Sequence, residues 1–183
     1  MAEHYLDNSA TTRVSQAAAE KAMELMLTDY ANPSSLHSFG FSAAKELESA
    51  RDKVAQALGA DSSEIHFTSG GTEANNLAIL GTVQAHKRRG NRIITSAVEH
   101  SSVYNTMQHL SAEGFDVVFI NPDENGVIKP AQVAQAVNDK TILVSIMLAN
   151  NETGALNPIR EIFTAVKRIN PNVILHTDAV QAL

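Results

Sequence analysis

Groups that could take part in chemistry gather in a few short segments of this chain, and the first segment contains two adjacent glycines. Residues 68–76 read TSGGTEANN and run directly into a helical pattern. Glycines let the backbone bend tightly, so several N–H groups can surround an anion at the positive end of the helix dipole, with the Thr72 hydroxyl as a further donor. The segment favours a phosphate site, with a simple capped turn as the structural alternative. The glycine patterns of nucleoside triphosphate and dinucleotide sites are both absent.

A histidine and an asparagine follow two later apolar runs. His100 lies in the segment 97–102, where its ring could act as a general acid or base or stack on a planar ligand. Asn150 opens the segment NNETG and offers amide donors to the edge of a ligand. The structural alternatives are a helix-cap neighbour for the histidine and an ordinary turn for the asparagine.

The last such segment is 176–181, which reads HTDAVQ. Asp178 would end a buried strand, and a buried carboxylate is costly unless a positive charge pairs with it. A protonated pyridine nitrogen would supply that charge and would turn the ring into an electron sink, whereas a salt bridge is the alternative. A metal pair of His176 and Asp178 is disfavoured, because no third ligand stands at an informative spacing.

Together these segments describe the partners of one ligand. They offer a phosphate cradle, a stackable histidine, an asparagine, and an aspartate followed three residues later by a glutamine. A ligand that uses all of them is planar, phosphorylated and contains a ring nitrogen. Pyridoxal 5′-phosphate fits that description.

The elements that must position these groups are predicted from hydrophobic spacing. Strands are expected at Glu64–Thr68, Arg92–Ser96, Asp116–Ile120, Thr141–Met147 and Val173–Thr177. Helices are expected at Ser15–Leu27, Ser42–Leu58, Thr72–Arg89, Ser101–Glu113, Pro130–Val137 and Pro158–Ile169. Gly59 is expected to end the second helix, whose apolar face carries Leu47, Ala50, Val54 and Leu58. Asn157 is expected to cap the last helix, with Pro158 in its first turn.

This alternation of strands and helices predicts an α/β fold. Right-handed crossovers would give a largely parallel sheet sandwiched by helices, a three-layer αβα arrangement. Ligands of such sheets bind beyond the carboxyl ends of the strands, which is where the polar segments fall.

Composition narrows the class of protein. The 183 residues include 14 basic and 20 acidic side chains, for a formal net charge of −6 with the histidines neutral. This acidity argues against nucleic acid as a partner, and 44% hydrophobic residues exclude a disordered chain. The absence of cysteine removes disulfides and thiol nucleophiles from this stretch. No apolar run approaches the roughly 20 residues of a membrane helix, and no secretory signal is recognised, so we expect a cytoplasmic protein without a membrane partner.

Several motifs, in order, make the sequence resemble the N-terminal half of a cysteine desulfurase of the NifS/IscS type. This family lies in the class V aminotransferase group, with the fold-type I architecture. The motifs are YLDNSATT at 5–12, NPSSLH at 32–37, FTSGGTEANNL at 67–77, Glu99-His100, NNETG at 150–154 and DAVQ at 178–181. The resemblance covers nearly the whole chain.

The resemblance implies a role for each candidate site residue. Six residues would hold pyridoxal 5′-phosphate: Gly71, Thr72, His100, Asn150, Asp178 and Gln181. The glycine and threonine would bind the phosphate, and Asp178 would pair with the pyridinium nitrogen. His100 would stack on the ring and assist proton transfer as the catalytic residue, while the two amide side chains would reach the ring hydroxyl side. No metal is expected.

The resemblance also implies a domain plan and an activity. Residues 1–183 would form the N-terminal part of the cofactor-binding large domain, with 1–40 as an N-terminal arm and helix. The lysine that binds the cofactor covalently and the cysteine that accepts sulfur would lie beyond Leu183, so this stretch alone is expected to be inactive. The full-length enzyme would convert L-cysteine to L-alanine and pass the sulfur to an enzyme persulfide.

Partners and alternatives follow from the same resemblance. We expect L-cysteine as substrate, a sulfur-acceptor or scaffold protein of iron–sulfur cluster assembly, and a homodimer with residues 32–37 near its interface. The alternatives are another class V enzyme, such as a selenocysteine lyase or an aminotransferase-like lyase, and a non-catalytic dimerising scaffold of the same fold. A generic nucleotide-binding α/β domain is disfavoured by its missing glycine patterns.

Overall fold

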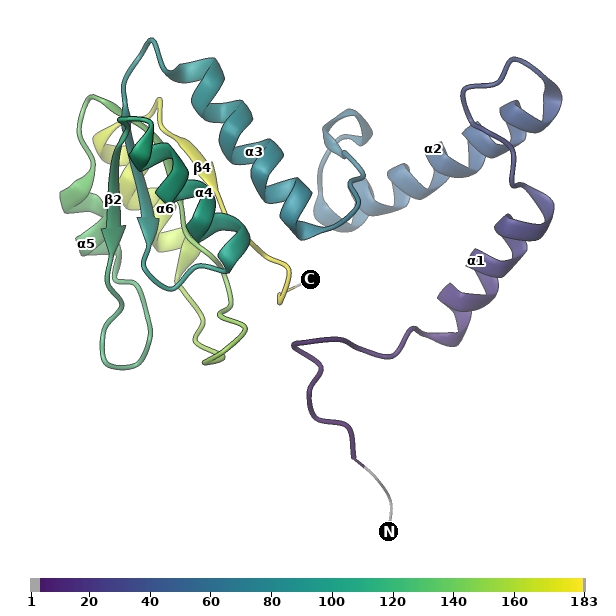
Figure 1. The fold of residues 1–183 in the computed structure, drawn as a ribbon, viewed down its shortest axis with the longest axis horizontal. Helices are drawn as coiled ribbons and strands as arrows, with labels where there is room; N and C mark the ends of the chain where they lie inside the picture. Colours follow the sequence, from purple (N-terminus) through teal and green to yellow (C-terminus); the bar gives the residue numbers. More distant parts are fainter. Residues whose placement is uncertain (1–3, 183) are drawn as a thin grey trace. The chain divides into compact units, whose positions relative to one another are not determined.

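The computed structural model describes residues 4–182. The chain divides into two compact units, the first ending at Phe67 and the second beginning at Thr68. The second unit contains every strand of the described chain (Figure 1). All six candidate site residues also belong to it.

A four-stranded parallel sheet forms the centre of the second unit. Its strands lie in the order β2-β1-β3-β4 and have the bounds Arg92–Ser96 for β1, Asp116–Ile120 for β2, Thr141–Ser145 for β3 and Ile174–His176 for β4. The central strand β3 is buried along its whole length, as a parallel strand covered on both faces must be. The predicted parallel sheet is confirmed.

Helices cover both faces of this sheet, and the alternation of side chains along each strand shows which helices lie on which face. Ile93 packs in one buried cluster with Ile79 and Met107, from α3 (Gly71–His86) and α4 (Ser101–Ala112). Its neighbour Ile94 packs in the other with Val133 and Ile162, from α5 (Pro130–Ala136) and α6 (Ile159–Ile169). The predicted three-layer αβα arrangement is confirmed.

The strand predicted at Glu64–Thr68 is wrong. The chain forms a 3-10 helix, η1, at Ser62–Glu64, and the backbone then runs extended without pairing to any strand of the described residues. The Glu64 carboxylate folds back to accept from the Asp61 backbone at 2.9 Å, and the Arg51 guanidinium donates to the Ile65 carbonyl. A β-branched run becomes a strand only where a neighbour completes its hydrogen bonds, and here local side chains take those groups.

The predicted cap of the last helix is also wrong. α6 begins at Ile159, and its N-cap is Pro158. The Asn157 side chain instead accepts from the Ile128 backbone and donates to the Met147 carbonyl, each at 2.8 Å. Asn157 is buried, so its amide satisfies two long-range backbone groups that would otherwise lack partners.

The first unit consists of two helices and η1. α1 (Gln16–Thr28) is capped by Ser15, and α2 (Ser38–Leu58) is capped by the His37 ring, which accepts from the Gly40 backbone at 3.2 Å. The histidine cap starts α2 four residues before the predicted Ser42. Gly59 ends α2 in the left-handed conformation, with φ of 66°, as predicted.

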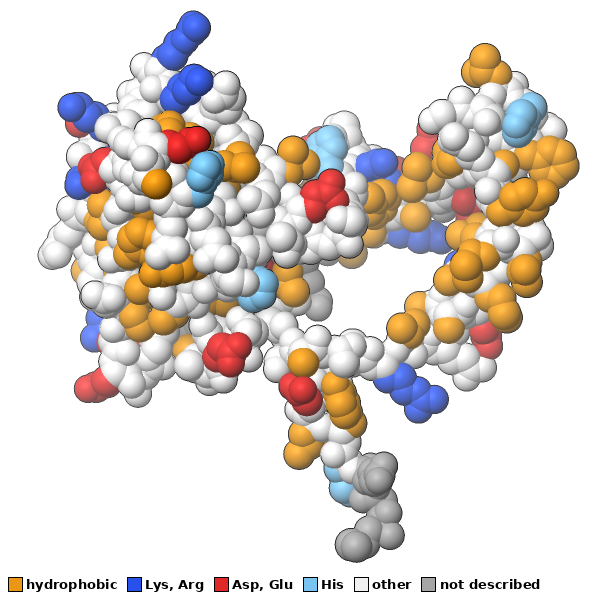
Figure 2. Space-filling model, in the orientation of Figure 1, with side chains coloured by type: hydrophobic (Ala, Val, Ile, Leu, Met, Phe, Trp, Pro, Cys, Tyr) orange, Lys and Arg blue, Asp and Glu red, His pale blue; other side chains and the backbone are white. Residues whose placement is uncertain are grey.

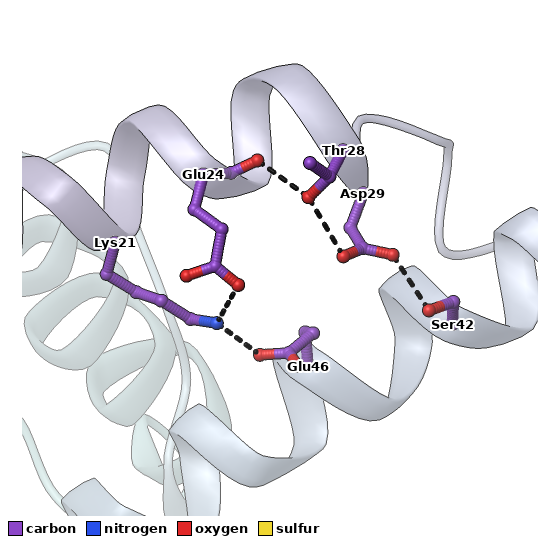
Figure 3. A network of polar contacts seen from close by, with 6 residues as sticks. All are labelled: Lys21, Glu24, Thr28, Asp29, Ser42 and Glu46. Carbon is purple, nitrogen blue, oxygen red and sulfur yellow. Dashed lines mark hydrogen bonds and ion pairs between the residues drawn. The ribbon is translucent and has the colours of Figure 1, made fainter.

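Polar contacts join α1 to α2 (Figure 3). The Lys21 ammonium lies 3.1 Å from Glu24 on its own helix and 3.4 Å from Glu46 on α2. The Ser42 hydroxyl donates to Asp29 at 2.8 Å. These groups are largely exposed to water, so each ion pair contributes little to stability.

Apolar burial in the first unit is small. Among its described residues only Gly40, Ala43 and Ala55 are buried. The predicted apolar face of α2 is exposed at Leu47 and Leu58, and Figure 2 shows hydrophobic side chains gathered on the surface of α1 and α2.

Candidate functional site

The carboxyl ends of β1, β3 and β4 bring the loops that follow them together. The Leu148 backbone donates to the Asp178 carbonyl at 2.9 Å, which joins the loops after β3 and β4. The Asn150 amide donates to the Val98 carbonyl at 2.8 Å, which joins the loops after β3 and β1. Segments widely separated in the sequence therefore form one edge, as the parallel topology predicts.

The glycine-rich turn forms the N-terminus of α3 beside this edge. Gly70 is the N-cap and offers no side chain, so no side-chain cap satisfies the first-turn N–H groups. A Cβ on Gly71 would lie 3.0 Å from the Val180 side chain, so the turn lies close against the segment that follows β4. The Glu73 carboxylate turns back to Ser69, accepting from its hydroxyl at 2.6 Å and its backbone at 2.7 Å, and these bonds lower the pKa of Glu73. The uncapped N–H groups suit an anion.

A chain of hydrogen bonds joins His100 to Asp178. His100 is the N-cap of α4, and its Nδ1 lies 2.8 Å from the Ser102 hydroxyl. The Asn75 amide nitrogen on α3 lies 3.0 Å from that hydroxyl and 2.8 Å from Asp178 Oδ2. A groove of about 360 Å³ between α3 and α4 is lined by Ser102 and Thr72, among others, so one residue of the network and one of the glycine-rich turn line the same groove.

Asp178 is a buried carboxylate without a cation. It is 7% exposed, and its second oxygen accepts from the Val180 backbone at 3.0 Å. Across residues 4–182, no lysine, arginine or histidine forms an ion pair with it. Two neutral donors only partly offset the cost of burying this charge. The site therefore suits a positively charged ligand group.

A second buried carboxylate, Glu99, lies at the same edge. One of its oxygens accepts from the Ser96 hydroxyl at 2.5 Å and from the Met147 backbone at 2.9 Å. The other oxygen is buried without a hydrogen-bond partner. Burial raises the pKa of Glu99, and the nearby charge of Asp178 adds to the rise while the hydrogen bonds oppose it, so that the pKa is about 7. Glu99 thus exchanges a proton near neutral pH.

The two predicted amide residues differ in their surroundings. Asn150 is buried, and its oxygen accepts from the Glu152 and Thr153 backbones at 2.9 and 2.8 Å, while its nitrogen also faces the Met147 sulfur at 3.4 Å. These contacts match the turn that was the structural alternative. Gln181 is exposed on the segment after β4. A cofactor contact of either amide stays a prediction.

His176 contacts Ser145 on the neighbouring strand, with Nδ1 2.8 Å from the hydroxyl. Burial lowers the pKa of His176, and the charge of Asp178 opposes that change. No three histidine, aspartate or glutamate side chains among residues 4–182 are arranged to hold a metal ion. None of the helices in that range is long and apolar enough to cross a membrane.

Comparison with known families decides the family. The sequence profile of the family described as Aminotransferase class-V matches residues 4–183. The chain belongs to the class V aminotransferase family. This class V chain is 44% identical over 179 residues to a cysteine desulfurase IscS of Clostridium botulinum, covering 98% of the chain and 45% of that protein. It is 44% identical over 178 residues to the putative cysteine desulfurase IscS 1 of Bacillus subtilis, covering 97% of the chain and 46% of that relative.

Solved structures agree with the class V assignment. A NifS-like protein superposes with a TM-score of 0.94 at 40% identity, covering 96% of this chain and 48% of the other. A structure titled SspA in complex with cysteine superposes with a TM-score of 0.91 at 36% identity, covering 97% of this chain and 51% of the other. The class V chain spans about half the length of the relatives it matches.

Sequence reasoning missed three residues of the candidate site. Asn75 and Ser102 stand between the predicted residues Asp178 and His100, and Glu99 lies beside the histidine. Glu99 belongs to the Glu99-His100 motif, but the sequence alone indicated no role for its carboxylate. Asn75 lies one turn after the glycines, so its helical spacing was the one available signal.

Proposed function

We propose that this chain is the cofactor-binding part of a pyridoxal phosphate-dependent cysteine desulfurase, which converts L-cysteine to L-alanine and transfers the sulfur to an enzyme cysteine. The observation that carries the proposal is the buried carboxylate of Asp178, which has no ion pair among residues 4–182 and lies beside an uncapped helix N-terminus. The printed names of the relatives from Clostridium botulinum and Bacillus subtilis support the choice of reaction.

The residues present fit this cofactor. Asp178 would hold the proton on the ring nitrogen, since the pair would give the buried carboxylate its missing positive partner. Gly71 and Thr72 would bind the phosphate through the open N–H groups of α3 and the threonine hydroxyl. His100 is exposed at the same edge, where its ring could lie against the cofactor ring and assist proton transfer. The cofactor, when bound, supplies an electron-withdrawing ring that weakens bonds at the substrate Cα.

The two amide residues would contact the hydroxyl side of the ring. Asn150 would do so by giving up its bond to the Met147 sulfur, which is a weak acceptor, while keeping its bond to the Val98 carbonyl. Gln181 would approach from the exposed segment after β4.

We also propose that the whole protein is a cytoplasmic homodimer that serves iron–sulfur cluster assembly through a sulfur-acceptor or scaffold partner. Large apolar side chains exposed on α1 and α2 support a dimer, because water contact with them is unfavourable. Residues 1–183 would be the N-terminal part of the large domain, with 1–40 as its arm and first helix.

The test uses the full-length protein and two matched variants. Wild type and Asp139→Asn, which changes an exposed aspartate, are expected to retain pyridoxal phosphate and release alanine from L-cysteine. Asp178→Asn is expected to bind the cofactor about 10- to 100-fold more weakly, the loss expected for one charge-assisted hydrogen bond. Cofactor content is read from visible absorbance, and alanine by amino-acid analysis.

Two results would overturn the proposal. A full-length protein that takes up no pyridoxal phosphate would favour the non-catalytic scaffold. A loaded protein that releases no alanine from L-cysteine but turns over selenocysteine or another amino acid would belong to a different class V reaction. The 183-residue chain alone is expected to release none, since no lysine of this stretch stands in the family's cofactor-binding motif.

A further inference from the structure

We propose that Ser102 and Asn75 are positioning residues that keep the proton of the neutral His100 ring on Nε2 and so leave that nitrogen as the proton donor of the ring. The inference rests on the proposed function for the use of that proton, but the position of the proton follows from the described hydrogen bonds alone.

Nδ1 of His100 faces a hydrogen-bond donor of the backbone. The Ser102 backbone N–H points at this nitrogen, with 3.2 Å between the two atoms. A backbone N–H can only donate, so Nδ1 must present its lone pair. A neutral imidazole carries one proton, which is then on Nε2.

The Ser102 hydroxyl strengthens this preference. It lies 2.8 Å from Nδ1, closer than the backbone nitrogen does. Its oxygen is 3.0 Å from the Asn75 amide nitrogen, which can only donate. With its oxygen accepting from Asn75, the hydroxyl has its own proton free to donate to His100.

Asp178 fixes the direction of the chain at the other end. An ionised carboxylate only accepts, and Asp178 Oδ2 lies 2.8 Å from the Asn75 amide group. Turning that amide over would place its oxygen against the carboxylate and leave Ser102 facing a second acceptor. Asn75 therefore donates one amide proton to each neighbour, and every hydrogen bond from Asp178 to His100 points the same way.

Burial makes this direction costly to reverse. Asn75 is 6% exposed and Ser102 is 8% exposed, so a partner lost at either position is costly to replace with water. The exposed member is His100, whose Nε2 takes no part in the chain. The network thus holds the His100 ring at Nδ1, on its buried side, and leaves the protonated Nε2 on its exposed side.

The experiment reads the tautomer directly. Full-length protein carrying ¹⁵N-labelled histidine is examined by NMR at about pH 8, where an ordinary histidine is neutral, with and without added pyridoxal phosphate. His100→Gln assigns the signal. Wild type is expected to show a pyridine-type Nδ1 and a pyrrole-type Nε2.

Three variants test the side chains. Ser102→Ala keeps the backbone N–H that caps α4 and loses only the hydroxyl, so it is expected to shift the tautomer ratio about fivefold towards Nδ1–H, as for one ordinary hydrogen bond. Asn75→Ala is expected to shift it the same way, because the hydroxyl is then free to accept. Ser101→Ala, an exposed neighbour on the same turn, is the control and is expected to match wild type. Ser102→Thr should restore the wild-type signal.

The outcomes separate this inference from the proposed function. A proton on Nδ1 in wild type, which needs no variant to detect, overturns the inference. Equal signals from Ser102→Ala and Ser101→Ala overturn it as well, because the contact would then be a helix cap only. A full-length protein that binds no pyridoxal phosphate overturns the proposed function while leaving the tautomer result unchanged.

Discussion

Replacing Glu99 with glutamine is expected to remove a loss of stability that wild type shows as pH rises from about 5 to about 8. The carboxylate bridges the loop after β1 to the end of β3 through Ser96 and Met147. Glutamine can keep both bonds through its carbonyl oxygen. Its amide nitrogen takes the place of the carboxylate oxygen that has no partner.

The magnitude follows from the pKa of Glu99, which burial raises from 4.5 to about 7. Between those values the folded protein holds a proton that the unfolded chain has released, so the free energy of unfolding falls as pH rises. The fall is between 1 and 2 kcal/mol for each pH unit, or about 3 kcal/mol over the whole range. The stabilising, protonated form is complete below 4.5 and lost above about 7.

The assay is urea unfolding followed by far-UV circular dichroism at several pH values. The quantity of interest is the free energy of unfolding of Glu99→Gln minus that of wild type. Contributions from titrating groups that do not interact with Glu99 cancel in this difference, which should rise by about 2.5 kcal/mol from pH 5 to pH 8. Glu124→Gln, which changes an exposed glutamate, should give a much flatter difference.

Two outcomes would refute the reasoning about Glu99. A difference that stays flat across the range would mean that burial does not penalise the charged form. A difference that falls with pH would mean that a positive group stabilises the carboxylate, contrary to the absence of an ion pair to Glu99 among residues 4–182.

Two further predictions concern stability and are read by the same urea assay. Gly90→Ala would place a Cβ 2.1 Å from the Lys140 carbonyl oxygen and should lower the free energy of unfolding by about 1–3 kcal/mol or more. Gly81→Ala, with open space around it in the middle of α3, should raise the free energy of unfolding by about 1 kcal/mol. Equal effects of the two substitutions would contradict the described packing. Burial lowers the pKa of His176, so wild type should lose stability as pH falls through about 6.5. His176→Gln should lose less stability over the same pH range. Equal losses of stability in wild type and variant would refute this prediction.

Much of the fold could be predicted because its signals are local. The limits of β1 and β2 match the predicted Arg92–Ser96 and Asp116–Ile120, since a short β-branched run between turn residues is typical of a buried parallel strand. Gly59 ends α2 as expected. The prediction failed at Glu64–Thr68, where the same kind of run finds no neighbouring strand among the described residues.

The candidate site was predictable only in part. The sequence identified Asp178 and His100 as polar residues beyond strand ends, and the parallel topology brings their loops to one edge. Asn157 shows the limit of such reasoning, because its local pattern fits a helix cap while its amide satisfies backbone groups of two other segments.

Apart from the strand wrongly expected at Glu64–Thr68, the sequence by itself determined the order of strands and helices, the fold class and the family, because periodicity and short motifs act within a few neighbouring residues. Only the tertiary structure decided which polar groups meet. Asn75 bonds to a carboxylate 103 positions further along the chain, and Glu99 reaches the backbone of Met147. Such pairings depend on which strand ends lie side by side. Burial raises the pKa of Glu99, and no lysine, arginine or histidine among residues 4–182 forms an ion pair with the buried Asp178.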